Sequence, residues 1–288
     1  MPREIFNRDY LFLARQELLT YEEITRLAQI MGDFGVRKIR LTGGEPLLRE
    51  DLHILVAMLS KTLPDVELAM TTNGSLLEKH AHLLKQSGLD RVTVSLDALD
   101  DQIFQEITDV QYSVDRVLNG IQAAYEAGLT PIKINMVVKR GLNENQILPM
   151  AEKFRKPGFI LRFIEFMDAG NSNQWKLEDV VSAREMVDIL QQASPLEEID
   201  ANYHGEVANR WRYRDEKGEI GIIASVTQPF CGDCTRMRLS AVGELYTCLF
   251  TNQGHDVREL LRKGASNQEI KKFISAVWHR RVDRYSEE

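Results

Sequence analysis

Cysteine is scarce in this chain of 288 residues, and the three that it has all lie in the short stretch FCGDCTRMRLSAVGELYTC, residues 230–248. An odd number of thiols in one segment excludes a framework of paired disulfides. Long apolar runs and a secretory signal over residues 1–9 are also lacking, so we expect no membrane partner. Positive charge is not in excess, because the net charge is −7, and this argues against nucleic acid as a partner. We therefore expect a cytoplasmic protein whose thiols serve a metal or catalysis.

Short β-branched runs alternate with amphipathic helices through the first three quarters of the chain. A capping box at Thr20 and Glu23 starts the first predicted helix. A second helix is expected to begin at Asp51 and a third to end near Gly88, and two more are expected over residues 113–128 and 144–156. Strand-helix units in succession imply a parallel sheet with helical crossovers. A (β/α) barrel, or part of one, is the leading prediction and an open doubly wound sheet the alternative. The expected strands are residues 36–44, 66–73, 91–97, 131–138 and 160–167.

The pattern changes after about residue 200. Residues 211–214 and 219–226 and a hairpin that turns at Gly243 indicate antiparallel strands, and two helices follow near residues 257–262 and 268–280. We therefore expect two domains, residues 1–200 and residues 201–288.

Polar side chains alternate with apolar ones along the expected parallel strands. Arg40, Thr71, Ser95 and Lys133 fall on the polar phase. If the apolar phase faces the helices, the polar phase lines the lumen, where uncompensated cations would cost several kcal/mol. We expect water, an anionic ligand or carboxylates such as Glu165 and Asp97 to compensate them. The alternative is a sheet with one face in solvent.

Gly43, Gly44, Glu45 and Pro46 follow the first expected strand, at the end where α/β folds bind their ligands. Adjacent glycines allow a ligand to approach the backbone closely, and Glu45 offers an acceptor for an amine. Alone, this segment would be a turn. Together with the polar lumen, it predicts a ligand site.

The spacing Cys-x2-Cys-x13-Cys fits two kinds of metal site. Cys231, Cys234 and Cys248 would bind zinc if His255 supplied a fourth ligand. A 4Fe-4S cluster held by the same three thiolates would leave one iron open. Arg236 and Arg238 alternate directly after the cysteine pair, which favours an anion beside the metal. Surface arginines on a zinc hairpin are the alternative.

The chain resembles the GTP 3′,8-cyclase family of radical S-adenosylmethionine enzymes, which begin molybdenum cofactor biosynthesis. The matching motifs occur in order over almost the whole chain and together are highly specific. They are KIRLTGGEPLLR, AMTTNGSLL, VTVSLDALD, PIKINMVVKRGLN, IEFMDAG, FCGDCTRMRLS and LYTCLF.

The resemblance implies an incomplete (β/α)6 barrel that lacks its first strand here, and a C-terminal domain that binds a 4Fe-4S cluster and GTP. By position, it assigns S-adenosylmethionine to Gly44, Ser95 and Met167, and the cluster to Cys231, Cys234 and Cys248. It assigns GTP to Arg40, Thr71, Lys133, Arg236, Met237 and Arg238. The implied reaction converts GTP to (8S)-3′,8-cyclo-7,8-dihydroguanosine 5′-triphosphate, which passes to the next enzyme of the pathway. The chain would be a monomer or a homodimer.

One part of the family pattern is absent from the sequence. Family members carry Cys-x3-Cys-x2-Cys before a Met-Pro pair, and this sequence opens with Met1 and Pro2; a C-terminal Gly-Gly tail is also missing. Since the first cluster has no ligands here, we expect this chain to be inactive in the cyclase reaction, through truncation or a misplaced start. The alternatives are a catalytically dead GTP-binding protein, another radical S-adenosylmethionine enzyme with a second cluster, or a structural zinc protein.

Overall fold

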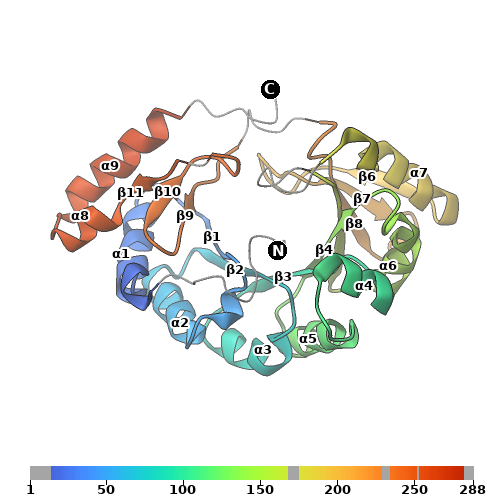
Figure 1. Cartoon of the computed structure of the whole chain (residues 1–288), viewed down its shortest axis with the longest axis horizontal. Coiled ribbons are helices and arrows are strands. Elements are labelled where there is room, and N and C mark those ends of the chain that lie inside the picture. Colours follow the sequence, from blue (N-terminus) through green and yellow to red (C-terminus); the bar gives the residue numbers. More distant parts are fainter. Residues whose placement is uncertain (1–13, 168–174, 229–233, 252, 282–288) are drawn as a thin grey trace.

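The computed structural model describes residues 14–167, 175–228, 234–251 and 253–281 (Figure 1). Two sheets organise this part of the chain: an eight-stranded sheet in the order β1-β2-β3-β4-β5-β8-β7-β6, and a three-stranded sheet in the order β11-β10-β9. The strands are β1 (Lys38–Leu41), β2 (Glu67–Thr72), β3 (Arg91–Ser95), β4 (Ile132–Val138), β5 (Phe159–Glu165), β6 (Leu196–Ile199), β7 (Asn209–Tyr213), β8 (Glu219–Ile223), β9 (Arg238–Leu239), β10 (Glu244–Tyr246) and β11 (His255–Asp256).

Helices surround the outside of the curved large sheet, as Figure 1 shows for α1, α2, α3, α5, α6 and α7. The α-helices are α1 (Tyr21–Gly32), α2 (Leu52–Thr62), α3 (Leu77–Gln86), α4 (Asp101–Thr108), α5 (Asp115–Glu126), α6 (Ile147–Phe154), α7 (Ala183–Ala193), α8 (Arg258–Arg262) and α9 (Asn267–His279). Short 3-10 helices are η1 (Arg15–Glu17), η2 (Pro46–Leu48), η3 (Glu144–Gln146) and η4 (Leu177–Asp179). In the described part of the chain, no helix is both long and apolar enough to cross a membrane.

The expected parallel sheet is confirmed. Strands β1 to β5 pair in parallel in chain order, and the expected capping box starts α1, with the Glu23 amide 3.2 Å from the Thr20 hydroxyl. The antiparallel pattern expected after residue 200 holds for β7 with β6 and β8, but β8 pairs in parallel with β5. The large sheet therefore continues through residue 200, and the division into residues 1–200 and 201–288 stays a prediction.

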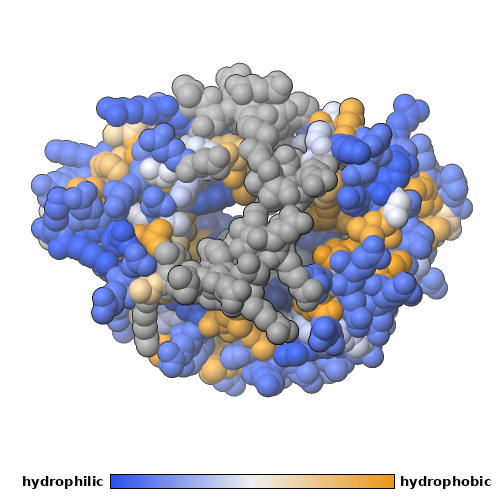
Figure 2. Space-filling model, in the orientation of Figure 1, coloured by the Kyte–Doolittle hydropathy of each residue, from blue (hydrophilic) through white to orange (hydrophobic). Residues whose placement is uncertain are grey.

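The main core lies between the sheet and the surrounding helices. Val94, Ile134, Met136 and Phe163 are each 0% exposed, which confirms that the apolar phase of these strands faces the helices. Hydrophilic residues make up most of the outer rim in Figure 2, with hydrophobic ones in small groups between them, as expected when the apolar faces of the helices turn inward.

Glu165 shares the apolar phase of β5 with Phe163, so it faces away from the lumen. The expectation that Glu165 compensates the lumenal cations is therefore wrong, because strand β5 presents Arg162 to the lumen instead.

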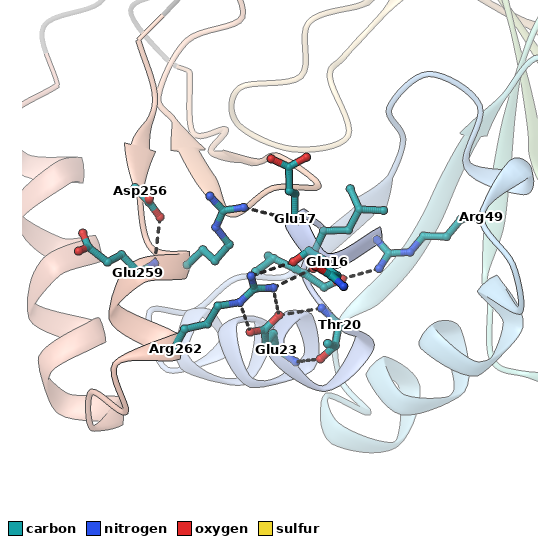
Figure 3. A network of polar contacts seen from close by, with 11 residues as sticks. Gln16, Glu17, Thr20, Glu23, Arg49, Asp256, Glu259 and Arg262 are labelled. Atoms are coloured by element: carbon teal, nitrogen blue, oxygen red, sulfur yellow. Dashed lines mark hydrogen bonds and ion pairs between the residues drawn. The ribbon is translucent and has the colours of Figure 1, made fainter. Parts of the chain in front are cut away.

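A second core joins the three-stranded sheet, α8 and α9 to α1. Its buried residues are Leu19, Leu27, Ile30, Leu245, Val257, Leu261, Ile270 and Ile274. Arg262 of α8 reinforces this junction, since its guanidinium donates to the carboxylate of Glu23 at 3.1 Å and to the carbonyl of Gln16 at 3.0 Å (Figure 3). The hairpin expected at Gly243 is confirmed, with φ +87° at the turn.

Candidate functional site

Arg40 of β1 reaches sideways across the lumenal face of two neighbouring strands. One guanidinium nitrogen lies 2.9 Å from the hydroxyl of Thr71 on β2 and 3.1 Å from that of Thr93 on β3. Solvent reaches Arg40 in the open lumen, yet burial by the surrounding chain lowers the pKa of its guanidinium. The threonines fix the position of the guanidinium without neutralising its charge.

Lys133 of β4 and Arg162 of β5 continue this set of cations around the barrel. Arg162 donates to the side-chain oxygen of Asn135 at 2.9 Å, which is again a neutral acceptor. Burial, followed by the charge of Arg162, lowers the pKa of Lys133 to about 8. Burial likewise lowers the pKa of Arg162 to about 10. The shared cause is that each charge has lost water without gaining a carboxylate.

The cations nearer the amino ends of the strands are arranged differently. The ammonium of Lys38 lies 3.0 Å from a carboxylate oxygen of Glu67, which also pairs with Arg91. By contrast, no carboxylate of the described residues forms an ion pair with Arg40, Lys133 or Arg162. The lumen therefore has two cations that share the carboxylate of Glu67 and a second set that lacks a carboxylate among the described residues and is available to an anion. We call Arg40, Lys133 and Arg162 the lumenal cation set.

Arg162 is the functional candidate that the sequence reasoning missed. Its side chain packs over Gly221 of β8, where an added Cβ would lie 2.9 Å from the Arg162 Cγ. The alternation in residues 159–165 contained the signal, because Phe159, Leu161 and Phe163 share one phase and leave Arg162 on the other. The expectation from sequence instead relied on the charge of Glu165, which lies on the other phase of the same strand and faces away from the lumen.

The other carboxylate expected to compensate the lumenal cations is Asp97. It accepts a hydrogen bond from the amide of Val137 at 2.7 Å, and burial raises its pKa to about 6. Since the described residues place no cation beside Asp97, it has no part in balancing the lumenal cation set.

The residues assigned to S-adenosylmethionine lie at or after the carboxyl ends of parallel strands. Gly44 follows β1 and is exposed, Ser95 ends β3 and is exposed, and Met167 follows β5 and is half-buried. Glu45 accepts hydrogen bonds from the Thr72 hydroxyl at 2.7 Å and the Asn73 amide at 2.7 Å. Glu45 thus ties this loop to the end of β2. The assignment of Gly44, Ser95 and Met167 stays a prediction.

The cysteine segment is described from residue 234 onward, so Cys231 lies outside the described residues. Cys234 and Cys248 are half-buried free thiols. Burial disfavours the Cys234 thiolate, but hydrogen bonds from Arg236, one of them 3.3 Å from the sulfur, outweigh burial and lower the pKa of Cys234. A thiolate is the form that binds metals, so this environment suits a metal ligand.

Arg238 lies close to both thiols. Burial lowers the pKa of its guanidinium, while the charges of Cys234 and Cys248 raise it. One guanidinium nitrogen of Arg238 is buried and has no hydrogen-bond partner among the residues that the structure describes. A buried donor of this kind requires an acceptor, and an anionic or carbonyl group of a ligand would provide one.

The zinc alternative needs His255 beside the cysteines. His255 is exposed on β11. Within the ranges that the structure describes, no three His, Cys, Asp or Glu side chains come together in a group that could hold a metal ion. His255 therefore does not join Cys234 and Cys248 in the described part of the chain. The assignment of a metal to Cys231, Cys234 and Cys248 stays a prediction.

The barrel sheet, the polar residues at the carboxyl ends of its strands and the thiols of the C-terminal segment are together typical of a radical S-adenosylmethionine enzyme. Residues 6–154 match the model of the radical SAM superfamily, and residues 159–287 match that of Molybdenum Cofactor Synthesis C. The chain belongs to the GTP 3′,8-cyclase family.

Two relatives illustrate this membership. The chain is 54% identical over 292 residues to the GTP 3′,8-cyclase of Acidothermus cellulolyticus, an alignment that covers 100% of this chain and 80% of that protein. It is 43% identical to the GTP 3′,8-cyclase of Staphylococcus aureus strain MRSA252, over 100% of this chain and 85% of that protein. The expected family resemblance is thereby confirmed.

A solved structure supports the fold alone. The crystal structure of Streptococcus suis SuiB superposes with a TM-score of 0.64 at 17% identity, over 86% of this chain and 59% of that one. The expected fold class, an incomplete barrel with a small antiparallel sheet, is confirmed.

Proposed function

We propose that this chain binds GTP in the barrel lumen, as the substrate of the GTP 3′,8-cyclase reaction of molybdenum cofactor biosynthesis. The observation that carries the proposal is the lumenal cation set: Arg40 and Arg162 donate to neutral acceptors, and no described carboxylate pairs with Arg40, Lys133 or Arg162. A triphosphate supplies the negative charge that these residues lack. Thr71 would keep Arg40 in place while the phosphates bind.

The second half of the substrate site is the cysteine segment. We assign a 4Fe-4S cluster to Cys231, Cys234 and Cys248, with Arg236, Met237 and Arg238 binding GTP beside it. The buried, unpartnered donor of Arg238 and the lowered pKa of Cys234 support this assignment. Held at both ends, the nucleotide would have its ribose fixed in one orientation, as a radical reaction at a single carbon requires.

Membership of the radical SAM superfamily implies S-adenosylmethionine and a 4Fe-4S cluster. In the family reaction, a reduced cluster of this kind would supply the electron that cleaves S-adenosylmethionine to methionine and a 5′-deoxyadenosyl radical, the species that would take a hydrogen atom from C3′ of GTP. We assign S-adenosylmethionine to Gly44, Ser95 and Met167, because they lie at the carboxyl ends of strands. We further propose that the protein is cytoplasmic and that its product passes to the next enzyme of the pathway.

Binding of GTP to the chain with its C-terminal cluster reconstituted under anaerobic conditions tests the proposal. Equilibrium dialysis should show GTP bound, and Arg238→Ala should weaken it about 10- to 100-fold, the effect of a lost hydrogen bond to a charged group. Arg184→Ala, an exposed arginine of α7, is the control and should leave the affinity unchanged. Absence of GTP binding by the parent chain, or equal affinity of Arg238→Ala, contradicts the proposal.

A second outcome separates the cluster from zinc. Metal and acid-labile sulfide analysis of anaerobically purified protein should give iron and sulfide in equal amounts. Zinc without sulfide would instead support the structural zinc site.

A further inference from the structure

Glu165, the last residue of β5, is a buried carboxylate that the proposed chemistry does not use. It is 0% exposed. One oxygen accepts from the Ala183 amide at 2.7 Å and the Thr227 hydroxyl at 2.6 Å, and the other accepts from the amides of Val226 at 2.7 Å and Thr227 at 2.8 Å. All four donors come from two segments that are distant from β5 in sequence.

These segments give the carboxylate a particular place in the fold. Ala183 is the first residue of α7, so one oxygen caps that helix. Val226 and Thr227 belong to the segment that leaves β8 and reaches Cys231 four residues after Thr227. In addition, the hydroxyl of Ser225 donates to the Glu165 carbonyl at 2.9 Å. Glu165 thus fastens residues 225–227, which precede the cysteine segment, to the carboxyl end of β5.

The position of β5 makes this connection relevant to the site. Arg162 of the lumenal cation set lies three residues before Glu165 on the same strand, and Met167 lies two residues after it. A strand transmits a shift at its end to its neighbours, because each pair of residues is fixed by ladder hydrogen bonds. Residues 225–227 precede Cys231 in the chain, so their contacts with Glu165 hold the residues from which the cysteine segment departs close to β5.

We propose that Glu165 is a positioning residue, which fixes the cysteine segment relative to the lumenal cation set so that one GTP molecule reaches both. This inference rests on the proposed GTP binding. A capping role confined to α7 would leave the cysteine segment unaffected, and this difference can be tested.

Two variants remove part of the connection. Glu165→Gln keeps the shape of the side chain but replaces one acceptor oxygen with an NH2 group, which faces two donors. Thr227→Val removes a single hydroxyl donor and keeps the amide. It is therefore expected to fold even if Glu165→Gln fails to fold. Thr227→Ser restores the hydroxyl. The matched control is Glu185→Gln, because Glu185 accepts from the Ser182 amide at the same end of α7 and does not touch residues 225–227.

The measurements are iron content, the electron paramagnetic resonance spectrum of the reduced cluster with and without GTP, and the affinity for GTP, all on the reconstituted full chain. We expect full iron content in every variant, since the three cysteines remain. Glu165→Gln and Thr227→Val should bind GTP about 5- to 20-fold more weakly and show a changed cluster spectrum, whereas Thr227→Ser and Glu185→Gln should match the parent chain.

The outcomes separate the two proposals. Parent-like spectra and GTP affinity in both Glu165→Gln and Thr227→Val overturn the positioning role, as does an equal loss in Glu185→Gln. If the parent chain fails to bind GTP, the proposed function falls. The positioning role is then decided by the cluster spectrum without GTP: a change in Glu165→Gln and Thr227→Val supports it, and an unchanged spectrum overturns it.

Discussion

Lys133 and Glu165 are both charged and almost inaccessible to water, with 8% and 0% exposure, and they lie on opposite faces of adjacent strands. Glu165 faces the helices and accepts four hydrogen bonds from the chain itself. Lys133 faces the lumen, where burial, followed by the charges of Arg162, Arg91 and Lys38, lowers its pKa, and the charge of Glu206 opposes them with a smaller effect.

The difference distinguishes a charge that serves the fold from one that serves a ligand. A buried charge is tolerated when hydrogen bonds replace its lost water, and Glu165 meets that condition within the protein. Lys133 has no such partner among the described residues, so its charged form destabilises the free chain and is stabilised by an anion from outside. The same contrast separates Lys38 and Arg91, which pair with Glu67, from the lumenal cation set.

The largest effect, on the free energy of unfolding, is expected when the carboxylate of Glu165 is removed. Glu165→Ala leaves four donors without an acceptor and should lower the free energy of unfolding by about 3–5 kcal/mol. Urea-induced unfolding measures this. Glu185→Ala removes a half-buried capping carboxylate that also pairs with Arg140, and it should cost about 1 kcal/mol. Equal losses in the two variants would contradict this contrast.

Deleting the unsatisfied charge should affect binding and spare the fold. Lys133→Met should weaken GTP binding about 10- to 100-fold, because a charged contact to phosphate is lost. The variant should be at least as stable as the parent at pH 7, since an uncompensated ammonium has been removed. Arg91→Met is the control, and because Arg91 already pairs with Glu67, this change should alter the affinity by no more than about threefold. Isothermal titration calorimetry decides, and an equal loss in Arg91→Met would refute the division of the cations into two sets.

A pH dependence follows from the same residue. The pKa of Lys133 is about 8 in the folded chain and about 10.4 in an unfolded one, so the unfolded chain binds more protons between these values. The stability of the free chain should therefore rise as pH increases from 8 to 10. GTP affinity should fall over pH 8–9, by up to tenfold per unit, because the neutral amine must first take up a proton. Subtracting the pH profile of GTP affinity of Lys133→Met from that of the parent chain removes the titration of GTP itself. Identical profiles in the two proteins would show that Lys133 does not cause the pH dependence.

The smallest effect concerns the space beside Arg162. In Gly221→Ala the new Cβ would lie 2.9 Å from the Arg162 Cγ, so this arginine must move. We expect GTP binding to weaken about three- to tenfold. In a double-mutant cycle with Arg162→Met, Gly221→Ala should cause no further loss, because both act through the same guanidinium. Additive losses would show that Gly221 acts by another route.

Much of the site could be predicted because strand periodicity is local. The alternation in residues 38–42 and 131–138 is enough to place Arg40 and Lys133 on the lumenal face, and the cysteine spacing indicates a metal. Glu165 could not be interpreted in the same way. Its charge suggested a partner for the cations, whereas its partners are amides whose positions depend on how β8 and α7 pack against β5.

The sequence by itself determined the five parallel strand-helix units, the capping box at Thr20 and the family, since hydrophobic period, capping residues and ordered motifs are properties of neighbouring residues. Only the tertiary structure decided which charges are neutralised. Strand β8 joins β5 in parallel, Arg162 packs over Gly221, and Glu67 pairs with both Lys38 and Arg91. Each of these contacts joins residues distant in sequence, so no local pattern encodes it, and these contacts leave the lumenal cations free to bind an anion.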